Sequence, residues 1–195
     1  MAVLVLLVLL AVGVVLLVVQ RSRRLRPPRS GTLALRERTL FDLQLGDIVQ
    51  ADGRDWVVED RLLYDDEGFQ WLEYLLRDGE VARWLVVCED DWLEVSWLES
   101  VPFRPPLPLP RQLSWQGRAY TLQEQGRASV TATLRRMNRR PGSCRYADYT
   151  AEDGDVLCVE LWGSGEDQEA EVTAGKRIDP ASLGLLPGDG RSVYR

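Results

Sequence analysis

The chain has 195 residues, a formal net charge of −6 and no histidine. Without histidine, Ser-His-Asp and Cys-His catalytic arrangements are impossible within this chain, and so are zinc sites that use imidazole. Residues 40–101 carry 17 acidic side chains against 4 arginines, which argues against nucleic-acid binding by the folded part.

Residues 2–19 form an unbroken run of 18 apolar residues, almost all of them valine and leucine. A helix of that length rises about 27 Å, close to the roughly 30 Å hydrocarbon core of a bilayer. The alternative, a cleaved signal peptide, needs a basic segment before the run and a small-residue cleavage site after it, and neither is present. We therefore expect a single transmembrane helix at residues 1–20.

A cluster of arginines follows the apolar run, within a basic juxtamembrane linker that we assign to residues 21–40. An excess of arginine on one side of a span marks the cytoplasmic side, so we expect the N-terminus outside and the main domain in the cytoplasm. The same side chains are expected to contact anionic lipid headgroups. They are Arg21, Arg23, Arg24, Arg26 and Arg29.

From Phe41 onward, short apolar runs alternate with turn signals about every 8 to 12 residues, which is typical of antiparallel strands. Five prolines between Val101 and Pro110 exclude a central strand there. We predict a mainly β fold with a first β unit at 41–101, a proline-rich connector at 102–111, a second β unit at 112–180 and a loose tail at 181–195. The two units form either two small barrels or one duplicated sandwich, depending on whether they share a core.

The two β units share a motif of an aromatic residue, an acid and a tyrosine, followed by Asp-Gly. The sequence WLEY at 71–74 with DG at 78–79 is matched, at identical spacing, by YADY at 146–149 with DG at 153–154. We interpret the match as an internal duplication.

Each Asp-Gly also predicts a two-residue hairpin turn, because a type I′ turn needs positive φ at both central positions. Such turns would place Leu75 opposite Ala82 and Tyr149 opposite Cys158.

The shared motif places a carboxylate beside aromatic rings in each unit, at Glu73 and at Asp148. A carboxylate in such surroundings can have a raised pKa and can face a ligand, for instance a cationic amine. The alternative is structural, with each acid accepting hydrogen bonds from a turn or pairing with an arginine. The candidate residues for a ligand or structural site are Trp71, Glu73, Tyr74, Arg83, Trp84, Tyr146, Asp148 and Tyr149.

Several of these motifs occur together in a known bacterial family. The order of Leu45-Gly46-Asp47, Gly53-Arg54-Asp55-Trp56, the two aromatic-x-acid-Tyr motifs, Glu160 and Gly175 resembles the domain of unknown function 4178 family over roughly residues 43–180. The resemblance implies a β-rich cytoplasmic domain, in some members tethered to a membrane segment, and implies no activity. Together with the apolar run, it places the chain in a bacterial cytoplasmic membrane as a single-pass protein.

Other chemistry finds little support in the sequence. The three cysteines lack C-x-x-C spacing, and no glycine-rich phosphate-binding motif is present. Acidic clusters such as Asp65-Asp66-Glu67 and Glu89-Asp90-Asp91 fit solvated turns better than calcium or magnesium sites. We therefore predict no catalytic residues, no metal and no cofactor.

Three functions remain open. The first is a membrane-tethered, non-enzymatic interaction module that docks a basic or an integral-membrane protein partner. The second is a binder of, or an enzyme acting on, a small and possibly cationic ligand through an aromatic-acidic pocket around Glu73 and Asp148. The third is an accessory subunit of a channel or transporter, although the apolar run has no G-x-x-x-G packing motif.

Overall fold

The computed structural model describes residues 37–132, 142–165 and 168–188. Within these residues, eleven antiparallel strands form a single sheet. The strands are β1 (Ile48–Ala51), β2 (Arg54–Asp66), β3 (Phe69–Asp78), β4 (Val81–Glu89), β5 (Leu93–Ser100), β6 (Gln112–Trp115), β7 (Arg118–Ala132), β8 (Gly142–Ala151), β9 (Asp155–Trp162), β10 (Glu169–Arg177) and β11 (Gly184–Leu186). A short 3-10 turn, Pro180–Ser182, precedes β11.

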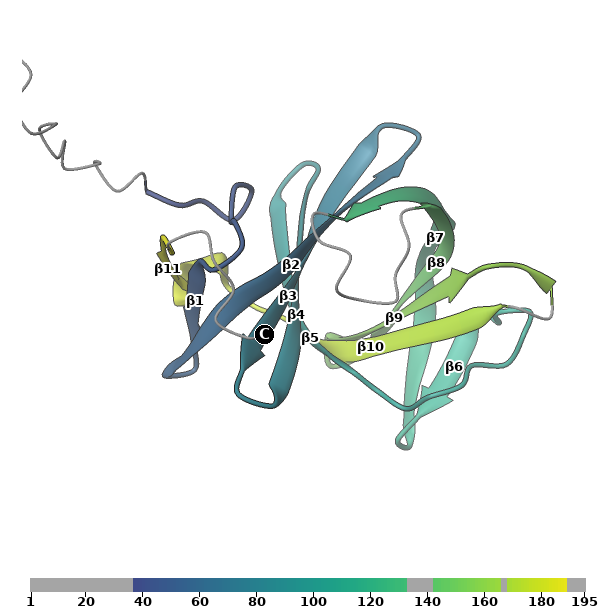
Figure 1. The fold of residues 1–195 in the computed structure, drawn as a ribbon. Helices are drawn as coiled ribbons and strands as arrows, with labels where there is room; N and C mark the ends of the chain where they lie inside the picture. Colours follow the sequence, from purple (N-terminus) through teal and green to yellow (C-terminus); the bar gives the residue numbers. More distant parts are fainter. Residues whose placement is uncertain (1–36, 133–141, 166–167, 189–195) are drawn as a thin grey trace, which may run out of the picture. The chain divides into compact units, whose positions relative to one another are not determined.

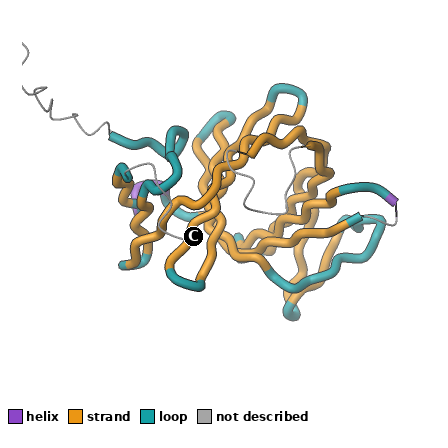
Figure 2. The backbone as a smooth tube through the Cα atoms, in the orientation of Figure 1, coloured by secondary structure: helices purple, strands orange, loops and turns teal. Residues whose placement is uncertain are grey.

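The sheet closes on itself. Its order is β11-β1-β2-β3-β4-β5-β10-β9-β8-β7-β6, and β2 also pairs with β7. The strands β2, β3, β4, β5, β10, β9, β8 and β7 therefore form a ring, which we call the closed sheet (Figures 1 and 2). The closing contact is short: residues 62–65 of β2 pair with residues 129–132 of β7, and there neither strand has a free edge.

The expectation of two small barrels or one sandwich is wrong, because the two β units pair with each other. Tyr64 lies opposite Val130 where β2 meets β7, and Leu98 lies opposite Gly175 where β10 meets β5. One buried cluster draws on both units. It contains Leu62, Tyr64, Leu75, Trp84, Leu98, Ala128, Val130, Cys144, Tyr146 and Val156. The coarser prediction of a mainly β fold is confirmed.

Alternation along β3 shows how one strand serves both faces of the sheet. Leu72, Tyr74 and Leu76 point outward into a second cluster, which Leu40, Leu43 and the 3-10 region cover. Trp71, Glu73 and Leu75 point inward, because successive side chains of a strand face opposite sides. Burial on both faces explains why large apolar residues occur on both faces of β3.

Segments before β1 and after β10 close the outer face of the first unit. Asp47, which is fully buried, accepts hydrogen bonds from the backbone N–H groups of Gln44 and Gly188 and forms an ion pair with Arg38, each at 2.7 Å. Part of the expected loose tail instead forms β11, whose residues 184–186 pair with β1.

Both predicted hairpin registers are wrong. Leu75 lies opposite Trp84 and Tyr149 opposite Leu157. Asp78 pairs with Val81, so the first turn is Gly79-Glu80, and only Gly79 has a positive φ, as a type II′ turn requires. The second connection has three residues, 152–154, and ends on Gly154 at φ 87.

No helix in the described parts of the chain is long and apolar enough to cross a membrane. The predicted transmembrane helix at 1–20 and the arginines at 21–29 lie outside the described residues.

Candidate functional site

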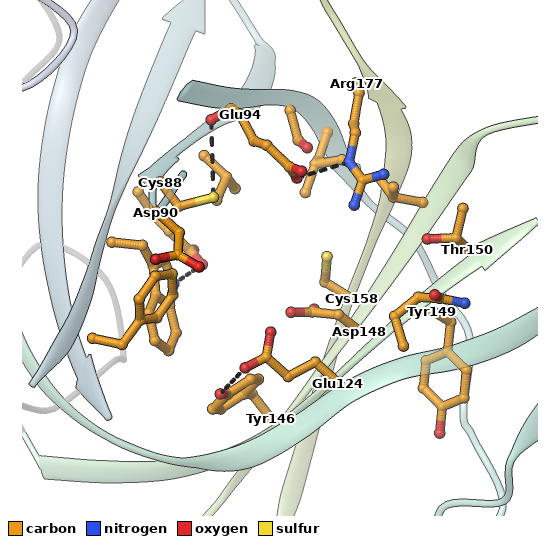
Figure 3. Close-up of a pocket in the computed structure, with 18 of the residues that line it drawn as sticks. Cys88, Asp90, Glu94, Glu124, Tyr146, Asp148, Tyr149, Thr150, Cys158 and Arg177 are labelled. Atoms are coloured by element: carbon orange, nitrogen blue, oxygen red, sulfur yellow. Dashed lines mark hydrogen bonds and ion pairs between the residues drawn. The ribbon is translucent and has the colours of Figure 1, made fainter. Parts of the chain in front are cut away.

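A cavity of about 300 Å³ lies inside the closed sheet. Seven strands contribute to its lining: β3, β4, β5, β7, β8, β9 and β10. Figure 3 shows side chains from opposite sides of the ring pointing toward its centre. The volume falls at the lower end of the roughly 300–1,000 Å³ typical of small-molecule pockets, so the cavity suits a small ligand.

Carboxylates dominate this lining. Seven acids border the cavity: Glu73, Asp90, Asp91, Glu94, Glu124, Asp148 and Glu160. Among the described lining residues the one base is Arg177, and its Nε lies 3.0 Å from Glu94 Oε2. The cavity therefore carries a strong excess of negative charge.

Glu124, Asp148 and Cys158 form a row across three neighbouring strands, which we call the acidic row. Glu124 of β7 lies directly opposite Asp148 of β8, and Asp148 lies directly opposite Cys158 of β9. A bulge at Gln123 puts Glu124 in this row, because the register shifts between Leu122 and Glu124. Without the bulge, Glu124 would share a face with Leu122, which packs against the outer cluster of the second unit.

The carboxyl of Asp148 has a raised pKa. Protein atoms enclose it on most sides, and this burial raises its pKa to about 6. A hydrogen bond with Cys158 and the charge of Arg177 lower the pKa, whereas the charges of Glu124 and Glu160 raise it further. Asp148 therefore titrates close to neutral pH.

The two cavity thiols stay protonated. Burial, followed by the charge of Asp148, raises the pKa of Cys158 well above its usual value. Burial and the charge of Glu94 raise the pKa of Cys88 to about 11. Since the thiolate is the reactive form, neither cysteine is equipped as a nucleophile.

Aromatic rings form one wall of the cavity and pack against one another. Trp71 stacks on Tyr64, with ring centroids 4.8 Å apart, and meets the ring of Tyr146 edge-on at 5.1 Å. Glu73 accepts hydrogen bonds from Trp71 Nε1 at 3.3 Å and from the Tyr64 hydroxyl at 3.4 Å. The same rings therefore fix the carboxylate of Glu73 in place.

The hydroxyl of Tyr146 lies between two carboxylates. It is 2.9 Å from Asp66 Oδ2 and 3.3 Å from Glu124 Oε1. A phenol has one proton and can donate it to one acceptor at a time. The other carboxylate then keeps acceptor capacity for a donor entering the cavity.

Two aromatic side chains flank the acidic mouth. Trp92 is 67 % exposed and Phe69 is 37 % exposed, beside the exposed Asp90 and Asp91. No group of three or more cysteine, aspartate or glutamate side chains in the described residues has the geometry to hold a metal ion. The arrangement is thus suited to binding organic cations and offers no built metal centre.

Comparison with known proteins places this geometry in a family. The family described as "Domain of unknown function (DUF4178)" matches residues 44–180. The chain belongs to this family. The match confirms the resemblance inferred from the sequence motifs over nearly the same residues.

Relatives of this DUF4178 protein carry no assigned activity. An uncharacterized protein of Aquifex aeolicus is 25 % identical over 154 residues, which cover 74 % of this chain and 83 % of that protein. Uncharacterized proteins of Mycobacterium bovis and Mycobacterium tuberculosis are 28 % identical over 149 residues, covering 73 % of this chain and 70 % of theirs. No solved structure matches the chain.

Five of the eight candidate residues border the cavity of the DUF4178 domain: Trp71, Glu73, Tyr146, Asp148 and Tyr149. Of these, Tyr149 donates its hydroxyl to Pro110 O at 3.0 Å, and Figure 3 shows its ring directed away from the cavity. Glu73 and Asp148, from different β units, therefore line the same cavity.

The other three candidates have positions outside the cavity. Tyr74 is buried in the outer cluster and donates to Leu40 O at 2.8 Å. Arg83 forms an ion pair with Glu99 at 3.1 Å, and Trp84 donates to Ser100 Oγ at 3.3 Å. Tyr74 and Arg83 belong to the outer face of the sheet, and Trp84 is buried in the cluster shared by the two units, so none of the three lines the cavity.

Sequence reasoning missed Glu124, Cys158, Glu160 and Arg177. Glu160 and Cys158 alternate with Val159 along β9, so a strand pattern alone could have placed both inside. Glu124 had no such signal, because the bulge at Gln123 changes the face that it occupies.

Proposed function

We propose that the closed sheet binds a small organic cation in its acidic cavity. The observation that carries this proposal is the charge of the lining, seven carboxylates against a single arginine that already contacts Glu94. A cation entering the cavity would meet several carboxylates in a space partly shielded from water, where charge attraction is stronger than in bulk solvent. The second function expected from the sequence is therefore the one that the geometry supports best.

The perturbed carboxyl of Asp148 supports the same proposal. A pKa near 6 means that the surroundings of Asp148 stabilise its charged carboxylate poorly. Such groups are common at functional sites, because structure tolerates a poorly stabilised charge where a ligand later compensates it. A positively charged ligand supplies that compensation.

Titration of the full chain in detergent micelles with matched probes tests the proposal. The probes are butylammonium, butyltrimethylammonium and butanol, which share a chain and differ in the head group. We expect at least one cation to bind roughly tenfold more tightly than butanol. A tenfold difference requires about 1.4 kcal/mol of charge attraction, which is modest for such a site. Calorimetry and thermal unfolding report the binding.

Variants separate the cavity from general surface charge. Glu124→Gln and Asp148→Asn should weaken cation binding, whereas Asp78→Asn, on a carboxylate that pairs with Arg54 outside the cavity, should leave it unchanged. Equal affinities for butanol and for both cations would refute the proposal. So would an equal loss of affinity in the Asp78→Asn control.

A membrane tether remains part of the proposed function. The apolar run at 2–19 and the arginines that follow it support an anchored module, with the binding domain held at the cytoplasmic face. A protein partner at the mouth, where Trp92 is exposed beside Asp90 and Asp91, is the interaction function that fits this arrangement.

We also propose that the two β units arose by duplication. Positive-φ pairs occur at Asp52-Gly53 and Gln116-Gly117, 64 residues apart. The bulges between Val58 and Asp60 and between Leu122 and Glu124 have the same separation. These correspondences support the inference. By the same registers Asp148, opposite Glu124, corresponds to Leu75, opposite Asp60, so Glu73 and Asp148 do not occupy equivalent places in the two units.

A further inference from the structure

We propose that the bound cation is an ammonium ion that retains N–H groups, and that it enters in exchange for a proton held by the acidic row. This inference rests on the proposed function, because it specifies the ligand and the proton balance of the same cavity. Three observations lead to it: the arrangement of the aromatic rings, the register of the acidic row, and the charged groups around Asp148.

The aromatic wall is not arranged as a cage for a quaternary ammonium. Trp71 stacks on Tyr64 and contacts the ring of Tyr146 edge-on, so these rings pack against one another and do not surround a cation site. Cages for quaternary ammonium ions present several ring faces to the cation. The groups that face the cavity at Glu124 and Asp148 are carboxylate oxygens, which are satisfied by N–H donors.

The acidic row places like charges directly opposite each other. Glu124 and Asp148 are register partners on adjacent strands, where facing side chains are separated by roughly 5 Å at Cβ. Two ionised carboxylates in that position repel, and a shared proton or a bound cation removes the repulsion. The next position of the row is the Cys158 thiol, which supplies a hydrogen bond and no positive charge.

The surroundings of Asp148 add little positive charge to the row. Arg177, the base that acts on it, also contacts Glu94 at 3.0 Å. The titratable and charged groups that face Asp148 are Glu124 of β7, Tyr146 of β8, Cys158 and Glu160 of β9, Arg177 of β10, and, across the cavity, Glu73 of β3, Cys88 of β4 and Glu94 of β5. Without a bound cation, a proton on Asp148 is therefore what offsets the negative charge of the acidic row.

The exchange balances in charge. The protonated row loses one proton to the buffer, and the ammonium ion takes its place against the two carboxylates. Because burial and its acidic neighbours raise the pKa of Asp148 to about 6, this proton is present below pH 6 and absent well above it. Affinity for the amine should consequently rise with pH until Asp148 is fully ionised.

Calorimetry on the full chain in detergent micelles tests both parts, with butylammonium as the probe. We expect affinity at pH 8 to be roughly tenfold higher than at pH 5, and about half a proton to be released per bound ion at pH 6. Buffers with different ionisation enthalpies measure that release. Butyltrimethylammonium, which has no N–H group, should bind at least roughly tenfold more weakly than butylammonium at pH 8.

Two variants and one control assign the proton. Asp148→Asn should remove the pH dependence and the proton release, while Asp78→Asn should keep both. Glu124→Gln should move the pH midpoint downward, because the charge of Glu124 raises the pKa of Asp148; this variant tests the row even if Asp148→Asn folds poorly.

The outcomes separate this inference from the proposed function. Equal binding of the two cations, or binding of butylammonium without pH dependence and proton release, overturns the exchange and leaves cation binding in place. Failure of both cations to bind better than butanol overturns the two proposals together.

Discussion

At the scale of single residues, the ionised carboxylate of Asp148 lowers the stability of the protein when no ligand is bound. Its pKa is raised from 3.8 to about 6, so between these values the folded state binds more protons than the unfolded state. Stability therefore falls as pH rises through this window. Asp148→Asn, which mimics the protonated acid, should increase the free energy of unfolding by up to about 3 kcal/mol at pH 8 and by only about 1 kcal/mol at pH 4.5.

Chemical denaturation of the full chain at the two pH values measures this difference. Asp78→Asn, on an exposed ion pair with Arg54, is the matched control and should change stability by less than about 1 kcal/mol at both. Destabilisation by Asp148→Asn at pH 8 would show that the carboxylate stabilises the fold, contrary to the role assigned here. A stability cost that a ligand can offset is the expected signature of a binding residue.

Residue patterns in the sequence predicted part of the site. The aromatic-x-acid-Tyr motif identified Glu73 and Asp148, because a period of two along a strand keeps an aromatic and the next acid on one face. The same motif wrongly grouped Tyr74 with them, although alternation sends Tyr74 to the opposite face. Glu124 could not be found, since a bulge that inserts one residue reverses the face of every later side chain.

At the scale of strands, local turn signals predicted where the strands lie. They could not predict which distant strands pair. Asp-Gly marked both hairpins but not their registers, because the first turn uses Gly79-Glu80 and the second has three residues. The closure of β2 on β7 joins residues more than 60 positions apart, as for Tyr64 and Val130. Nothing in the local sequence distinguishes that pairing from two separate units.

The junction of β10 and β5 requires a glycine. A Cβ at Gly175 would overlap the backbone carbonyl oxygen of Trp97 and lie 3.0 Å from Leu98 Cα. Because backbone atoms of a paired strand cannot move aside cheaply, Gly175→Ala should lower the free energy of unfolding by about 1–3 kcal/mol. Gly184→Ala is the control, since its Cβ would meet only the side chain of Gln50.

Denaturation of both variants measures the difference between these two strand pairings. If Gly175→Ala is as stable as Gly184→Ala, the β5–β10 junction is looser than described, and the cavity that it closes would be open on that side. A selective loss in Gly175→Ala would instead show that this pairing is needed to hold the ring.

At the scale of the whole molecule, one shared interior explains why the site draws on both units. Neither β unit alone surrounds a cavity, because each supplies four of the eight strands in the ring. The pairing of the two units brings Glu73 from the first and Asp148 from the second to the same cavity. The proposed binding site then depends on both units, and a fragment that contains one unit should lack it.

The location of the domain is the last prediction, and it depends on the N-terminal segment. The full chain should stay with membranes after alkaline carbonate washing, whereas a variant without residues 2–19 should be released, because the apolar run supplies nearly all the transfer free energy for insertion. In sealed spheroplasts, an added protease should spare a C-terminal tag and remove an N-terminal one. Replacing the five arginines between residues 21 and 29 with glutamine should weaken that orientation while leaving membrane association intact. Release of the full chain by carbonate, or protease attack on the C-terminal tag, would contradict a cytoplasmic domain on a single membrane span.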